Sequence, residues 1–181
     1  MKAISKFIFW IFGWKTVGEA PALKKYVAIL APHTSGWDLI FGLCARYIFG
    51  LDISLMAKKE IFVFPVGPLL RAMGGIPVDR SSKHNMVDQA VEIFNTRDRF
   101  ILAIAPEGTR KYVAKWKTGF YYIALKARVP IVPAYLDYAN KTVGMGEPFY
   151  PTGDIDSDIR KLMEFYVPIK GKHPEMGVIL K

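Results

Sequence analysis

The sequence has little of what builds cross-linked or metal-rich proteins. In 181 residues it contains a single cysteine, Cys44, and three histidines, His33, His84 and His173. One cysteine excludes an intrachain disulfide and fits a reducing compartment, and its place in the apolar run 39–45 predicts a buried residue. No two histidines have the spacing of metal ligands, so we expect no metal site.

Acidic residues are also scarce. The chain has 16 Asp and Glu against 25 Lys and Arg, which leaves a net charge of +9. Such a charge favours nucleic acid, phospholipid surfaces or phosphate-bearing substrates as partners. Nucleic-acid binding would predict surface aromatics among the basic residues, whereas most aromatics here lie in apolar runs. We therefore expect an anionic lipid surface or a phosphorylated substrate, and no nucleic acid.

No apolar run reaches the roughly 20 residues that a membrane span needs. The aromatic segment Phe7–Phe12 is flanked by lysines, a combination typical of helices that lie in the membrane interface. We predict an amphipathic membrane-association helix over residues 1–16 of a peripheral or monotopic protein, at the cytoplasmic face. A helix packed on the protein's own core is the alternative. A signal peptide is disfavoured, because cleavage would leave Pro21 at the new terminus.

Residues 17–181 alternate strand-like and helical patterns, which is typical of an α/β fold. We predict a single layered domain with a mixed, mostly parallel central sheet flanked by helices. The expected strands are 26–30, 53–57, 76–78, 100–105 and 131–136, and the expected helices are 37–49, 85–94, 119–128 and 155–166. Asp154 is the expected cap of the last helix. Pro133 places the last strand at a sheet edge or a bulge.

Three polar clusters each follow a predicted strand, where α/β folds usually collect their sites. The first contains His33 and Asp38, which would face different sides if both stood in one helix. They can meet only if His33 lies in the turn before a helix capped by Ser35, with Asp38 facing back from the first turn. That geometry suits a general base and the carboxylate that orients it. Alternatively, Asp38 only caps the helix and His33 is an ordinary loop residue.

The second cluster, Gly74–Arg80, ends a strand with an acid and a base. Arg80 offers a bidentate fork for a phosphate or carboxylate. Taken alone, Asp79 and Arg80 would more simply form a surface turn. The cluster becomes informative only together with the other two.

The third cluster follows the predicted strand 100–105 directly and consists of Glu107, Gly108, Thr109 and Arg110. The glycine permits close approach of backbone to a ligand, and the arginine supplies an anion contact. An exposed basic loop is the alternative reading. The position of the cluster directly after a buried strand favours a functional site over an ordinary exposed loop.

In this order the clusters resemble the motif blocks of the lysophospholipid and glycerol-phosphate acyltransferase family. His33 to Asp38 matches the His-x-x-x-x-Asp block, Gly75–Arg80 the second block, and Glu107–Arg110 the third. The proline-centred strand Val129–Pro133 is similar to the fourth. The blocks cover about residues 26 to 136, and their combination is far more specific than any one motif.

The resemblance implies acyl transfer without an acyl-enzyme. His33 would deprotonate the hydroxyl of a lysophospholipid-type acceptor, which then attacks an acyl-CoA or acyl-carrier-protein thioester, while Asp38 orients His33. The resemblance assigns the acceptor site to Arg80, Glu107, Gly108, Thr109 and Arg110. No cofactor is implied beyond the thioester co-substrate, and phospholipid biosynthesis or remodelling is the expected setting. Backbone amides after His33 are one candidate for stabilising the oxyanion.

Two prolines depart from the family pattern. Pro32 stands where many members have a polar residue, and Pro77 replaces an aromatic of the second block. The acceptor therefore stays open between a lysophosphatidate, another lysophospholipid and an amino-acid lipid. A serine hydrolase is disfavoured because no Gly-x-Ser-x-Gly occurs. A membrane-binding protein without activity is the remaining alternative, against which the intact His33 and Asp38 argue.

Overall fold

The structure, a computed structural model, describes residues 1–79 and 86–179. Its strands are β1 (Lys15–Val17), β2 (Lys25–Leu30), β3 (Ile53–Lys58), β4 (Gly75–Val78), β5 (Phe100–Ile104), β6 (Ile131–Asp137) and β7 (Thr142–Met145). Its helices are α1 (Lys2–Phe12), α2 (Trp37–Phe49), α3 (Val66–Ala72), α4 (Met86–Thr96), α5 (Gly119–Ala127) and α6 (Ile155–Tyr166), with short 3-10 turns η1 (Lys59–Ile61) and η2 (Pro174–Met176).

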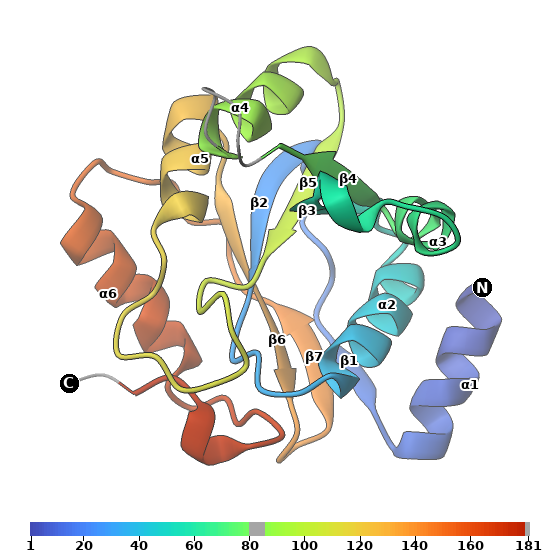
Figure 1. Ribbon diagram of the computed structural model, residues 1–181. Helices are drawn as coiled ribbons and strands as arrows, with labels where there is room; N and C mark the ends of the chain where they lie inside the picture. Colours follow the sequence, from blue (N-terminus) through green and yellow to red (C-terminus); the bar gives the residue numbers. More distant parts are fainter. Residues whose placement is uncertain (80–85, 180–181) are drawn as a thin grey trace.

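Within these residues the strands form one seven-stranded sheet in the order β1-β7-β6-β2-β5-β3-β4 (Figure 1). Neighbouring strands are parallel except β6 and β7, which are antiparallel. The predicted α/β class with a mixed, mostly parallel sheet is therefore confirmed. Because parallel strands point the same way, β2, β5 and β6 deliver the segments after them to one edge of the sheet.

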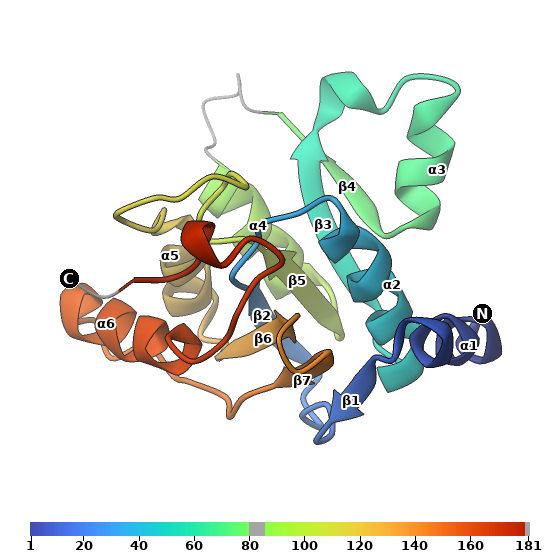
Figure 2. The ribbon, with the colours of Figure 1, turned by 90° about the horizontal axis from the view of Figure 1, so that it is seen from below.

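Helices cover both faces of the sheet (Figure 2). Side chains alternate between the two faces along each strand, so β2 sends Val27 and Ile29 into a core shared with α4, α5 and α6. On the other face lie α1 and α2, whose Phe9 and Phe41 pack with Leu136 of β6. Cys44 of α2 is buried in this second core, as predicted.

The predicted position of the strand with Pro133 was half right. β6 is an interior strand between β2 and β7, so the sheet-edge position is wrong. A bulge does occur opposite Pro133. Ala134 pairs with Met145, and Ile131 pairs with Phe149. Three residues along β6 therefore correspond to four residues along the opposite segment, which contains the extra residue of a bulge. The irregular ladder there accommodates a residue that lacks an N–H.

The start of α2 also differs from the prediction. The N-cap position is Gly36, and Ser35 lies one residue earlier, where its Oγ accepts the N–H of Trp37 at 3.3 Å. The cap predicted for α6 is confirmed, since Asp154 accepts the N–H of Ser157 at 3.2 Å. β1, β7 and α3 were not predicted.

Candidate active site

His33 and Asp38 meet at the carboxyl end of β2. His33 lies in the turn before α2 and Asp38 in the first turn of that helix, which is the geometry that their spacing requires. Nδ1 of His33 is 2.9 Å from Oδ2 of Asp38. An ionised carboxylate at this distance holds the proton on Nδ1 and leaves the lone pair of Nε2 free. The His33 side chain is 27% exposed, so a substrate can reach it.

Asp38 is only 1% exposed and every contact favours its charged form. Its Oδ2 also accepts the backbone N–H groups of Thr34 and Ser35, each at 2.9 Å. Burial by itself would raise the pKa of Asp38, but hydrogen bonds from His33, Tyr138 and Ser35 outweigh burial and hold the pKa below its usual value. Asp38 is therefore an anion at neutral pH.

The same hydrogen bonds bear on the expected oxyanion stabiliser. The amides after His33 were one candidate, yet the N–H groups of Thr34 and Ser35 both point at Asp38. They are used to fix the carboxylate and do not face a reacting carbonyl. The amides of Thr34 and Ser35 thus hold the carboxylate that contacts His33.

A third residue, Tyr138, completes the group and was not predicted. Its hydroxyl donates to Oδ1 of Asp38 at 2.7 Å, and its ring packs edge-on against Trp14 with centroids 5.0 Å apart. Burial, and then the hydrogen bond to the Asp38 carboxylate, raise the pKa of Tyr138, so it remains a neutral donor. The available sequence signal was its position just after the strand predicted at 131–136. No motif block marks it.

Glu107, from the loop after β5, contacts the base through the main chain. The N–H of His33 donates to Oε1 of Glu107 at 3.0 Å. The side chain is 6% exposed, and its Oε2 has no hydrogen-bond partner within the described residues. Burial raises the pKa of Glu107. The carboxyl group thus supports the turn that carries His33.

The rest of the third cluster is more exposed. Gly108 has φ of +64°, which favours glycine, and a Cβ there would lie 2.7 Å from Nζ of Lys117. Thr109 is exposed and its Oγ1 accepts the N–H of Lys111 at 3.4 Å. The glycine therefore accommodates a lysine side chain of the same loop.

Arg110 reaches back to the start of α2. Its Nη1 lies 3.2 Å from the point where a Cβ on Gly36 would stand, so the glycine leaves room for the guanidinium beside the His33 turn. Arg110 makes no ion pair with any described residue. Arg80, the other arginine expected in the acceptor site, lies outside the described residues.

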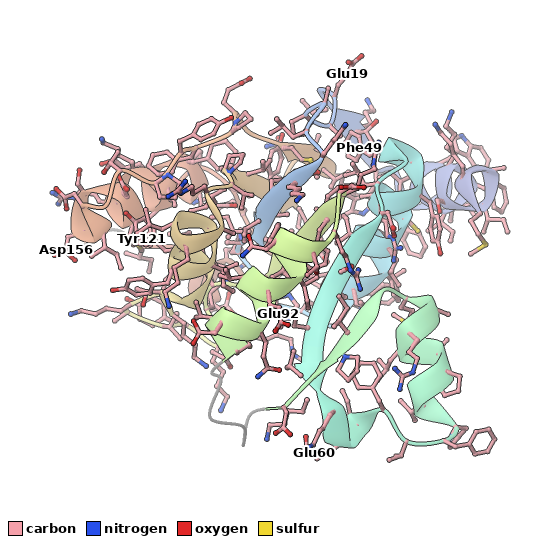
Figure 3. The ribbon with its side chains drawn as sticks, turned by 90° about the horizontal axis from the view of Figure 1, so that it is seen from above. Glu19, Phe49, Glu60, Glu92, Tyr121 and Asp156 are labelled. Atoms are coloured by element: carbon pink, nitrogen blue, oxygen red, sulfur yellow. The ribbon has the colours of Figure 1, made fainter. Side chains whose placement is uncertain are left out.

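An apolar cavity of about 420 Å³ lies between α2 and the sheet. Its lining includes Gly36 at the start of α2 and Phe49 at the end, so the cavity follows the helix for roughly 18 Å. Figure 3 labels Phe49 at that far end. His33, Asp38 and Arg110 line the near end.

Small side chains on the sheet leave the space for this cavity. Ala28 of β2 pairs with Ala103 of β5, and both line the cavity beside Ala134 of β6. At the far end two hydrogen bonds fix the Arg46 guanidinium. Its Nη1 donates to the carbonyl of Met73 at 2.7 Å, and its Nη2 donates to Oδ1 of Asp52 at 2.9 Å. The result is a long apolar channel with an imidazole at one end.

Within residues 1–79 and 86–179 no group of three or more His, Cys, Asp or Glu side chains is placed to hold a metal ion. The chemistry that these residues offer is proton transfer. The structure thus has an imidazole with a free Nε2, held by a buried carboxylate, at the end of an apolar channel, and these are the groups that general-base chemistry on an apolar ligand requires.

A family model described as Acyltransferase matches residues 16–137. This chain therefore belongs to the acyltransferase family, and the family that the sequence resembles is confirmed.

Similar curated proteins are 1-acyl-sn-glycerol-3-phosphate acyltransferases. Those of Saccharomyces cerevisiae and Limnanthes douglasii are 28% and 29% identical over 137 and 141 residues, and that of Haemophilus influenzae is 24% identical over 144. The alignments cover 71%, 74% and 75% of this chain but 44%, 49% and 59% of the relatives. The chain thus spans about half the length of the curated relatives that it matches.

A crystal structure of a 1-acyl-sn-glycerophosphate (LPA) acyltransferase from Thermotoga maritima has a similar fold, with a TM-score of 0.62. The superposition covers 91% of this chain and 74% of that one, at 20% sequence identity. At this identity the likeness establishes the shared α/β fold.

Proposed function

We propose that this protein transfers a fatty acyl group from an acyl-CoA or acyl-carrier-protein thioester to the hydroxyl of a lysophospholipid-type acceptor. The observation that carries the proposal is the position of the His33 imidazole, oriented by Asp38, at the end of the 420 Å³ apolar channel. The channel suits an acyl chain, and the imidazole suits deprotonation of a hydroxyl. The similarity to 1-acyl-sn-glycerol-3-phosphate acyltransferases supports the same chemistry.

In the proposed step, Nε2 of His33 takes the proton of the acceptor hydroxyl as its oxygen attacks the thioester carbonyl. The tetrahedral intermediate then collapses, the carbon–sulfur bond breaks, and the imidazolium returns the proton to the departing thiolate. The products are an ester and a free thiol. Asp38 stabilises the imidazolium between the two proton transfers. Cys44 is not a nucleophile in this scheme, because it is buried and burial raises the pKa of its thiol.

We place the membrane on the side of the molecule formed by α1 and α3, which flank α2 in Figures 1 and 2. No helix in the described part of the chain is long and apolar enough to cross a bilayer. α1 packs on α2 through Phe9 but leaves Phe7 and Trp10 exposed, the latter by 75%. Lys2 and Lys6 of the same helix can contact anionic headgroups.

The segment from η1 to α3 supports the same orientation. It exposes Val63, Phe64 and Leu69, and Phe64 is 88% exposed. Contiguous exposed apolar side chains of this kind mark contact surfaces. With α1 and α3 on the bilayer, α2 and the channel beneath it face the lipid from which an acyl acceptor is drawn.

The test is release of free thiol from acyl-CoA or acyl carrier protein, measured with a panel of lysophospholipid and amino-acid-lipid acceptors. His33→Ala should lower turnover by roughly 10²- to 10⁴-fold. Glu92→Gln, on the exposed face of α4 (Figure 3), is the matched control and should leave turnover unchanged. Full turnover by His33→Ala would refute the role of the base. No acceptor-dependent thiol release by the wild type would refute acyl transfer itself.

A further inference from the structure

A second, polar pocket of about 310 Å³ adjoins the apolar channel. It lies between the turn that carries His33, the loop after β5 and the segment after α6. Gly36 and Arg110 line both hollows, so the two meet beside the base. The remaining walls of the polar pocket are formed by Thr34, Ser35, Lys111, His173 and Met176.

The segment after α6 is fixed against the His33 turn. The N–H of His173 donates to Oγ1 of Thr34 at 3.2 Å, and the N–H of Tyr138 donates to the carbonyl of Lys170 at 2.8 Å. A Cβ on the buried Gly171 would lie only 2.6 Å from Oγ1 of Thr34. Glycine is thus required for this close approach. Residues 170–173 lie outside the part of the chain that the family model matches, residues 16–137.

The pocket offers donors and positive charge. Nζ of Lys172 lies 4.9 Å above the ring of Trp37 in the first turn of α2, which holds the ammonium close to the pocket. Arg110 and Lys111 make no ion pair with any described residue. Two acidic groups are nearby: Glu175, whose Oε1 is 3.7 Å from Nδ1 of His173, and the buried Asp38, whose Oδ2 accepts the N–H groups of Thr34 and Ser35 behind the pocket wall.

Two buried hydroxyls in the wall have unused donors. Thr34 is 4% exposed and Ser35 is 8% exposed, and within the described residues each side-chain oxygen accepts a backbone N–H but donates to nothing. Both lie at the start of α2, where their backbone N–H groups bind Asp38 and their hydroxyls remain as the donors available to a ligand. Hydroxyl donors, a guanidinium and an ammonium together suit the oxygens of a phosphate group.

We propose that this pocket binds a phosphate monoester of one of the two substrates, and that the segment after α6 belongs to the site through Lys172 and His173. The inference rests on the proposed function, because the position of the pocket beside His33 matters only if a substrate reacts there. The phosphate belongs either to the acceptor, next to its reacting hydroxyl, or to the acyl donor. The shared chemistry is a phosphate dianion held next to the base.

The experiment compares Lys172→Ala and the double variant Lys172→Ala/His173→Ala with the wild type. The KM is measured for an acceptor with and without its phosphate, and for acyl-CoA against an acyl-pantetheine that lacks phosphate. We expect the double variant to raise the KM for one phosphate-bearing substrate roughly ten- to hundredfold, with little change for its phosphate-free analogue. The arm that changes identifies which substrate carries the phosphate.

Lys170→Ala is the matched control, because it removes the same charge from the same segment, whereas only the ammonium of Lys172 lies over Trp37, next to the pocket residue Gly36. Lys172→Arg should retain most of the affinity. Equal effects on phosphate-bearing and phosphate-free substrates in both arms, or no effect in either, would overturn the proposal.

A binding measurement separates this proposal from the proposed function. Glycerol 3-phosphate should raise the melting temperature of the wild type and of Lys170→Ala, and the rise should be lost in the double variant. If the wild type shows this binding but no thiol release, the pocket stands and acyl transfer fails. If thiol is released but the double variant keeps the full rise, acyl transfer stands and the assignment of Lys172 and His173 fails.

Discussion

The hydroxyl of Tyr138 donates a hydrogen bond of 2.7 Å to Oδ1 of Asp38, a residue 100 positions earlier in the chain. Both carboxylate oxygens are therefore engaged, Oδ1 by the tyrosine and Oδ2 by the imidazole of His33. Such a chain of hydrogen bonds restricts the carboxylate and, through it, the imidazole. Tyr138 touches neither reacting atom in the proposed step, so we regard it as a positioning residue.

Tyr138→Phe should lower kcat by about tenfold, the cost of one hydrogen bond to a charged group. The ring and its packing on Trp14 stay in place, so KM should change little. Loss of this hydrogen bond also raises the pKa of Asp38, so the loss of unfolding free energy on acidification should begin at a higher pH than in the wild type. A role in packing alone would lower the melting temperature equally at all pH values.

Asp38→Asn should destabilise the fold in a pH-dependent way. The pKa of Asp38 is lower in the folded state than in the unfolded state, so its contribution is complete above the unfolded pKa of about 3.9 and is lost as pH falls through the folded value. We expect the variant to lose about 1–3 kcal/mol of unfolding free energy at pH 7. Denaturant titrations should show this difference shrinking below about pH 4. A difference that is constant with pH would contradict an ionised Asp38.

Glu107→Gln distinguishes support of the His33 turn from binding of the acceptor. The amide oxygen can still accept the N–H of His33, while the cost of burying a charge disappears. Because the pKa of Glu107 is raised by burial, the ionised group opposes folding at neutral pH. The variant should therefore melt about 2–4 °C higher and keep its KM for the acceptor.

Glu107→Ala is the companion variant, because it removes the acceptor of the His33 N–H. We expect it to lower kcat. If Glu107→Gln instead raises the KM for the acceptor several-fold, the carboxylate binds substrate directly.

Gly42→Leu tests the channel as the acyl-chain site. Gly42 lines the channel on α2, and a Cβ there would meet no heavy atom within 4 Å, so a larger side chain can enter the space. Thiol release from long-chain donors should fall by tenfold or more, because the leucine side chain displaces part of the acyl chain, at a cost of about the free energy of burying two methylene groups. Short-chain donors should keep their rate. Gly42→Ala is the control.

Removing a helix-interior glycine stabilises α2 by about 0.5–1 kcal/mol, so unfolding would not explain a loss of thiol release in Gly42→Leu. Equal effects on both chain lengths would place the acyl chain elsewhere.

The sequence predicted the local features of the site better than its distant contacts. His33 and Asp38 are five residues apart, so spacing alone restricted how they meet, and the structure has that geometry. Tyr138 depends on the parallel pairing of β2 with β6, which no local pattern encodes. β7, only four residues long, was missed because so short a segment carries little periodicity.

The position of Pro133 shows the same limit. A proline predicts a missing ladder hydrogen bond, but it does not determine whether an edge or a bulge supplies the gap. Here the ladder is interrupted by the extra residue between Met145 and Phe149. This bulge depends on the antiparallel return of the chain beside β6. The segment after α6 likewise joins the polar pocket through a tertiary contact, the bond between His173 and Thr34.

The exposed apolar side chains of α1 and of the segment from η1 to α3 provide the last prediction, which concerns membrane binding. Trp10→Glu in α1 and Phe64→Glu before α3 each place a charge where we propose that lipid lies. Each variant should weaken co-sedimentation with anionic phospholipid vesicles by roughly tenfold or more, because a large aromatic side chain contributes about 1.5–3 kcal/mol on burial. Tyr150→Glu, at a site exposed by 63%, is the control and should bind as the wild type does. If only Trp10→Glu weakens binding, α1 alone is the anchor and α3 faces water. If neither does, the membrane lies on another side of the molecule, and α2 with its channel does not face the lipid.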